Sequence, residues 1–190
     1  MRDLGKRAPA NRGRSLLGAV VVVLVASTQV AAQDPPQRTI ISIPGYAAPV
    51  LLDTIGVPRE IDAPAPRAFA ALVLAYEALR IPVRLRDTTR RYIGNLHYVK
   101  MRELGGTAMS RYIECGNDMT GARADKYRVH LAIVSRIDSI APGKSRLKSS
   151  VIAGAEDVMG TSIYPIPCGS TGALESRIAQ LVSGQARPVP

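Results

Sequence analysis

The most regular pattern in the chain is an alternation of apolar and polar side chains over residues 126–138. Successive side chains of a β-strand point to opposite faces of its sheet, so this pattern predicts a strand with one buried face. Antiparallel sheets commonly pack one face on a core in this way. The expected members of the buried face are Tyr127, Val129, Leu131, Ile133 and Ile137, with Ser135 as the one polar position among them.

Two other segments show the three- and four-residue spacing of an amphipathic helix. The first covers residues 66–80 and is followed by Pro82; the second begins near Thr171, the expected N-cap, and ends at Gly184. The apolar stripes consist of Phe69, Leu72, Val73, Tyr76 and Leu79 in the first helix and of Leu174, Ile178, Leu181 and Val182 in the second. Because neither helix can bury its stripe alone, we predict an α+β fold, with an antiparallel sheet that carries both helices on one face.

Shorter strand-like segments complete the predicted sheet. They are residues 39–43, 50–61, 81–85, 91–104 and 146–153. Within residues 91–104 the apolar positions change parity near Tyr98, which indicates either a β-bulge or two short strands.

The first 32 residues have the three parts of a secretory signal peptide. Arg12 and Arg14 precede an apolar run at 16–26, and small residues lead to an expected cleavage site between Ala32 and Gln33. The run is shorter than the ~20 residues that a membrane-spanning helix needs. We therefore expect a periplasmic or secreted protein with no stable membrane span after processing. An uncleaved N-terminal anchor is the alternative.

These patterns divide the chain into four parts. We expect residues 1–32 to be the signal peptide, residues 33–49 a linker and lead-in, residues 50–184 a single α+β domain, and residues 185–190 a flexible tail. The 158 residues that remain after cleavage suit one domain with a hydrophobic core.

Cys115 and Cys168 are the only cysteines of the chain. In an exported protein, an even number of cysteines favours a disulfide, and we predict that these two are bonded. The alternative is a zinc site completed by His97 and His130, the only histidines. No two of these four residues have the short spacing that structural zinc sites favour.

The charge of the chain restricts its partners. The leader contains five basic residues and one acidic residue, so the remainder holds 20 basic and 14 acidic residues and has a net charge of +6. This excess is modest, aromatic residues are few, and no DNA-binding motif is present, so nucleic acid is not an expected partner. Anionic components of the cell envelope suit a mildly basic surface better.

Catalytic motifs are not recognisable in the chain. Gly143-Lys144-Ser145 resembles the end of a phosphate-binding loop, but Asp138 stands where the first glycine of that motif is needed. Neither histidine lies in a recognisable nucleophile motif, and the loop carboxylates Asp118 and Asp125 have no motif that pairs them. We expect no catalytic, cofactor-binding or metal-ligating residues, although enzymatic activity stays open.

The expected order of elements is strand, helix, two strands, two further strands and helix. The segments that carry a family resemblance are residues 60–64, 69–83 and 174–178. In these the chain resembles the helix-grip module of the bacterial outer-membrane lipoprotein family of BamC (also called NlpB). Residues 110–116 and 168–175 are similar to uncharacterised exported bacterial proteins. The chain differs from the lipoprotein family because it lacks a lipidated cysteine and a tandem pair of modules.

The resemblance implies a role in the cell envelope. Our leading interpretation is an exported, non-enzymatic module that binds an envelope protein or an anionic envelope component, or that stabilises an assembly. The alternative is a carrier of a small apolar ligand held between helix and sheet, and an enzyme is the third reading.

A candidate binding surface follows from the strand at 126–138. If its apolar face meets the helices, then Lys126, Arg128, His130 and Arg136 lie on the opposite face. No predicted element covers that face, so Ala132 and Val134 would form an apolar centre inside a basic rim, suited to an acidic partner. The alternative is a solvated face that binds nothing.

The leader yields the first testable prediction. The exported protein should begin at Gln33, because the small residues before it fit a signal-peptidase site. Intact mass and N-terminal sequencing of the exported form measure this directly. A membrane-bound form that retains Met1 would contradict the prediction.

Overall fold

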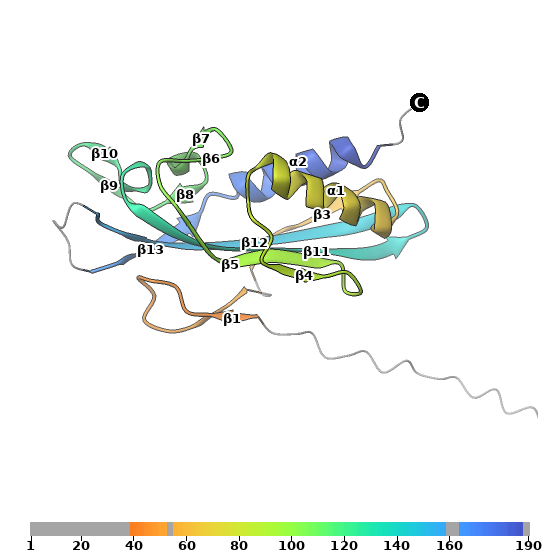
Figure 1. Cartoon of the computed structure of the whole chain (residues 1–190), viewed down its shortest axis with the longest axis horizontal. Helices are drawn as coiled ribbons and strands as arrows, with labels where there is room; N and C mark the ends of the chain where they lie inside the picture. Colours follow the sequence, from red (N-terminus) through yellow and green to blue (C-terminus); the bar gives the residue numbers. More distant parts are fainter. Residues whose placement is uncertain (1–38, 53–54, 159–163, 188–190) are drawn as a thin grey trace, which may run out of the picture. The chain divides into compact units, whose positions relative to one another are not determined.

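The computed structural model describes residues 39–52, 55–158 and 164–187, and the leader with its cleavage site lies outside this part. Its centre is an antiparallel sheet in the order β4, β5, β11, β12, β13, β8 (Figure 1). Strand β3 pairs with the same edge of β12 as β13 does, but nearer to the start of β12. The strands are β3 (Pro58–Ile61), β4 (Leu85–Asp87), β5 (Tyr92–Lys100), β8 (Ile113–Glu114), β11 (Arg128–Ala141), β12 (Lys144–Glu156) and β13 (Ile166–Ser170). The α+β prediction is confirmed.

The longest strands, β11 and β12, form one continuous hairpin. Their register runs from the pair Arg128 and Glu156 to the pair Ala141 and Lys144, and a turn at Pro142 and Gly143 joins them. Gly143 adopts a φ of +74°, which suits the glycine position after a proline in a tight turn. The Gly143-Lys144-Ser145 sequence therefore enters a strand rather than a helix, unlike a phosphate-binding loop.

Both helices lie on the same face of this hairpin, as predicted (Figure 1). Helix α1 (Ala65–Ala78) begins with a proline in its first turn and ends before Arg80, whose φ is +55°. Helix α2 (Ala173–Gln185) lies beside α1. The core between helices and sheet includes Leu72, Tyr76, Leu131, Ile133, Val151, Leu174 and Ile178, all fully or almost fully buried. No helix of the described residues is long and apolar enough to cross a membrane.

One polar position interrupts this core. Ser135 and Ser149 lie opposite each other on β11 and β12, with their hydroxyl oxygens 2.7 Å apart. Tyr76 of α1 donates a hydrogen bond of 3.0 Å to Ser135. Burial raises the pKa of the Tyr76 hydroxyl well above its usual value. The serine that interrupts the apolar alternation is thus satisfied, and it links a helix to both central strands.

The second face of the sheet is covered by a segment that the sequence analysis assigned largely to a linker. Strands β1 (Ile40–Ile41) and β2 (Val50–Leu51) form a small hairpin on the side opposite the helices (Figure 1). This segment and the sheet together form a second core, which consists of Ile41, Ile43, Leu52, Ala132, Val134 and Ile152. The described fold therefore includes residues 39–49, which were predicted to be a linker and lead-in.

Close contact between this hairpin and the sheet depends on Gly154 of β12. A Cβ atom at Gly154 would lie 1.7 Å from the carbonyl oxygen of Pro44. The absence of a side chain therefore lets the main chain at Ile43 and Pro44 rest directly on the sheet.

The parity change in β5 is a β-bulge, the first of the two predicted explanations. Leu131 pairs with Tyr98 and Ile133 pairs with Asn95, so Leu96 and His97 together lie opposite the single residue between them on β11. The buried Asn95 side chain supports the bulge, since it accepts a hydrogen bond from the His97 amide and donates one to the Pro82 carbonyl.

Residues 103–125 contain two copies of one small unit, a hairpin of two two-residue strands followed by a short 3-10 helix. The first copy is β6 (Glu103–Leu104), β7 (Thr107–Ala108) and η2 (Met109–Arg111). The second is β9 (Asn117–Asp118), β10 (Gly121–Ala122) and η3 (Arg123–Asp125), each element 14 positions after its counterpart. The copies meet where Asp125 accepts hydrogen bonds from the amide and the hydroxyl of Ser110, both 2.7 Å long.

Replacement of Gly154 tests how the β1–β2 hairpin packs on the sheet. Gly154→Ala should lower the free energy of unfolding by about 1–3 kcal/mol, because the new methyl group meets a main-chain carbonyl that cannot rotate away. Urea unfolding measures the loss, and amide hydrogen exchange should show faster exchange at Ile41 and Leu52.

Gly169→Ala is the matched control for this variant. Gly169 lies in the adjacent strand β13, and a Cβ atom there would meet no atom within 4 Å. Its stability should therefore change little. Equal stability of the two variants would contradict the role assigned to Gly154.

Candidate functional site

The basic residues predicted to form a binding surface are each close to an acidic partner. Arg128 Nη1 and His130 Nε2 lie 3.9 Å and 3.0 Å from the Glu156 carboxylate, and Arg136 Nη2 lies 2.9 Å from Asp138. The positive charges of Arg128 and Arg136 are therefore offset locally.

Lys126 does not belong to the predicted strand at all. It follows η3, and its ammonium group donates to Asp118 and to Thr120. This hydrogen bond, with those from Thr120, holds the pKa of Asp118 well below its usual range. The two carboxylates considered for catalysis are thus engaged separately, Asp118 with this lysine and Asp125 with Ser110.

The apolar centre expected between these basic residues is not exposed. Ala132 and Val134 are buried, because β1, β2 and the adjoining residues cover them. The predicted docking patch of an apolar centre in a basic rim is therefore wrong. The reason is that β1, β2 and the adjoining residues, predicted largely to be a linker and lead-in, cover this face of the sheet.

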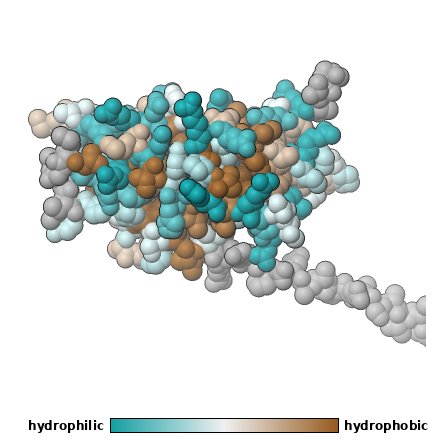
Figure 2. Space-filling view, in the orientation of Figure 1, coloured by the Kyte–Doolittle hydropathy of each residue, from teal (hydrophilic) through white to brown (hydrophobic). Residues whose placement is uncertain are grey.

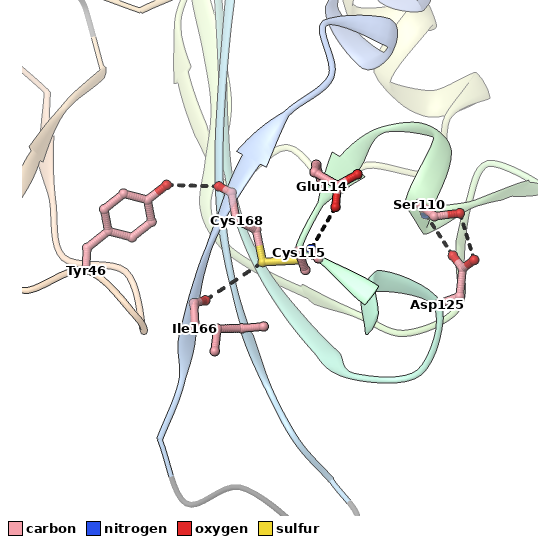
Figure 3. Close-up of a disulfide and its surroundings, with 8 residues drawn as sticks. Tyr46, Ser110, Glu114, Cys115, Asp125, Ile166 and Cys168 are labelled. Atoms are coloured by element: carbon pink, nitrogen blue, oxygen red, sulfur yellow. Dashed lines mark hydrogen bonds between the residues drawn. A yellow bond between two sulfur atoms is a disulfide. The ribbon is translucent and has the colours of Figure 1, made fainter. Parts of the chain in front are cut away.

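The predicted disulfide between Cys115 and Cys168 is confirmed (Figure 3). It joins neighbouring strands, because β8 pairs with β13 through Glu114 opposite Gly169, one residue from each cysteine. Tyr46, from the segment after β1, donates a hydrogen bond of 2.9 Å to the Cys168 carbonyl. The zinc alternative is wrong because both sulfur atoms are used in the disulfide. Among the described residues, no three His, Cys, Asp or Glu side chains form a group that could hold a metal ion.

Thr171 continues this connection beyond β13. Its amide and its hydroxyl both donate to the Tyr112 carbonyl, at 2.9 Å and 3.0 Å, and the hydroxyl also lies 2.8 Å from the Arg111 carbonyl. The N-cap of α2 is Gly172, with a φ of +79°, so Thr171 lies one residue before the capping position predicted for it. Its hydroxyl accepts a hydrogen bond of 3.3 Å from the Ala173 amide and also holds the start of α2 against η2.

A surface groove of about 690 Å³ lies between these two elements. One wall comes from β7 and η2 and the other from α2. The polar residues that line it are Thr107, Ser110 and Arg111 on the first wall and Ser176, Arg177 and Gln180 on the second. We call this the η2–α2 groove.

Two arginines without an ion-pair partner line the η2–α2 groove. Arg111 and Arg177 are exposed, and neither forms an ion pair with another residue of the described part of the chain. The acidic side chains nearest in sequence have other partners: Glu175 accepts from the Ser170 hydroxyl, and Glu114 accepts from the Gly116 amide. A guanidinium group presents several donors in a plane and suits carboxylate or phosphate oxygens. The groove can therefore bind an anion, with hydroxyl and amide groups beside it.

Sequence reasoning missed this groove because its walls are far apart along the chain. The disulfide, the β8–β13 pairing and Thr171 help to bring residues 107–111 and 176–180 together. The predicted disulfide was the available signal, since it places the residues around 115 beside the start of the last helix.

Comparison with known proteins assigns no family. No protein-family model matches the chain, and no curated protein matches its sequence. The similarity to the BamC family stays a prediction from sequence.

Loss of the disulfide should destabilise the fold and the groove together. Cys115→Ser with Cys168→Ser opens a loop with a sequence separation of 53, for which chain entropy predicts a loss of about 4 kcal/mol. Urea unfolding measures the loss, and titration of the unfolded, unreduced wild-type protein should find no free thiol. Two free thiols in that titration would contradict the bond.

Proposed function

We propose that this chain is an exported module that binds an anionic component of the cell envelope through the η2–α2 groove. The observation that carries the proposal is the pair of unpaired arginines, Arg111 and Arg177, on opposite walls of one groove. Binding in such a groove has an electrostatic contribution that weakens as the salt concentration rises.

Two features support export. A disulfide is favoured in compartments outside the cytoplasm and rare inside it. The leader sequence, with its apolar run and small residues before Gln33, points to the same destination. The resemblance to an outer-membrane lipoprotein family is consistent with a partner in the envelope.

The packing favours surface binding over the carriage of an apolar ligand. A carrier of the helix-grip type would hold its ligand between the helices and the sheet. Here that space contains large side chains such as Leu72, Tyr76 and Ile133, which have no exposed surface. The η2–α2 groove, by contrast, lies at the surface, and polar side chains such as Ser110, Arg177 and Gln180 line it.

Site-specific crosslinking in the intact envelope tests the proposal. A photoreactive amino acid at Gln180, which lines the groove and is exposed, should capture a defined partner. The double variant Arg111→Glu with Arg177→Glu should abolish this capture, because it replaces both cations by anions. Mass spectrometry of the captured product identifies the partner.

Arg67→Glu is the matched control. Arg67 is exposed on α1 and does not line the groove, so this substitution reverses a helix-borne charge without changing the site. Capture that persists in the double variant, or that is lost equally in the control, would overturn the proposal.

A further inference from the structure

A second candidate surface lies on the other side of the sheet, along β4. Two adjoining cavities of about 630 Å³ and 400 Å³ share Leu85 and Leu96 as lining residues. The larger also contacts Ile40 of β1, and the smaller extends past His97. We call the two together the β4 trough. It is separate from the η2–α2 groove and shares no lining residue with it.

The two sides of the trough are strands that are paired on one edge only. Among the described residues, β4 is the last strand of the main sheet and pairs only with β5, and β1 pairs only with β2. An unpaired strand edge presents main-chain N–H and C=O groups that can pair with another extended segment.

Apolar side chains line the trough between these strands. Ile40 is 62% exposed, and Leu85 and Leu96 are each partly exposed. The bulge in β5 places Leu96 and His97 side by side opposite one residue of β11, and both residues line the trough. In the space-filling view, apolar areas lie between hydrophilic ones on the visible face (Figure 2). Alternate side chains of an extended peptide point to the same face, so its apolar residues can contact these apolar side chains together.

The charged residues that line the β4 trough indicate which kind of extended segment can bind there. Arg84 and Arg86 line the trough, whereas Asp87, its one acidic lining residue, already accepts a hydrogen bond from the Arg90 amide. Antiparallel pairing of two copies of β4 centred on Arg86 would place this arginine against its counterpart, which disfavours self-association in that register. An acidic segment meets no such repulsion.

We propose that the β4 trough receives an extended segment of a partner protein, with alternating acidic and apolar residues, as an added strand on β4. The main chain of β4 supplies the hydrogen bonds, Leu85 and Leu96 contact the apolar residues, and Arg84 and Arg86 face the acidic ones.

A synthetic peptide of alternating glutamate and valine is the probe for this proposal. It should bind the purified protein saturably in isothermal titration calorimetry, and the affinity should fall as salt is raised. The same peptide with alternate amides N-methylated cannot pair along one edge, and it should bind at least about tenfold more weakly because its inter-strand hydrogen bonds are lost.

Variants locate the binding site. Arg84→Glu with Arg86→Glu should weaken binding about tenfold or more, and Ile40→Glu, at an exposed position, should weaken it without a large effect on folding. The double variant at Arg111 and Arg177 should bind the peptide like wild type, which separates this surface from the η2–α2 groove. Absence of binding, or equal binding of the N-methylated peptide, would overturn the proposal.

Discussion

The paired strands β11 and β12 supply side chains to two hydrophobic cores, one on each face of the sheet. On the first face Leu131, Ile133 and Val151 meet the helices, and on the second Ala132, Val134 and Ile152 meet the N-terminal hairpin. On the second face, the main chain at Pro44 approaches the sheet so closely that a Cβ atom at Gly154 would lie 1.7 Å from the Pro44 carbonyl oxygen.

The disulfide connects this double-faced sheet to the candidate site. Cys168 lies in β13 beside β12, and Cys115 lies at the end of β8, which is itself preceded by η2. One covalent bond therefore places η2 near the start of α2, and Thr171 sets the final contact between them. The second copy of the hairpin unit supports the same wall, because Asp125 of η3 holds Ser110 of η2. The groove borders the first core, because Tyr112 belongs to that core and also lines the groove.

The sequence predicted those parts of the structure that depend on local periodicity. The face of β11 that carries Val129 to Ile137, both helices, the bulge in β5 and the disulfide are confirmed. Strand-like segments were predicted at residues 39–43 and 50–61, but their pairing over the second face was not, because strands of two residues each are too short to show alternation. A signal for it was present in the central strands: Ala132 and Val134 interrupt a row that is otherwise charged. Apolar residues on a polar face indicate a covering layer as readily as a docking patch, and the pattern of one strand does not distinguish the two.

The chain has an excess of basic residues, but the basic residues without acidic partners do not lie on the surface predicted from the sequence. Arg128, His130 and Arg136 lie on long strands whose neighbouring positions supply Glu156 and Asp138 as partners. Glu156 lies opposite Arg128 on the paired strand, whereas Asp138 lies two residues after Arg136 on the same strand. Arg111 and Arg177 come instead from a 3-10 turn and a helix that meet through tertiary contacts. Neither of these two arginines forms an ion pair with another described residue, so both are available to a ligand.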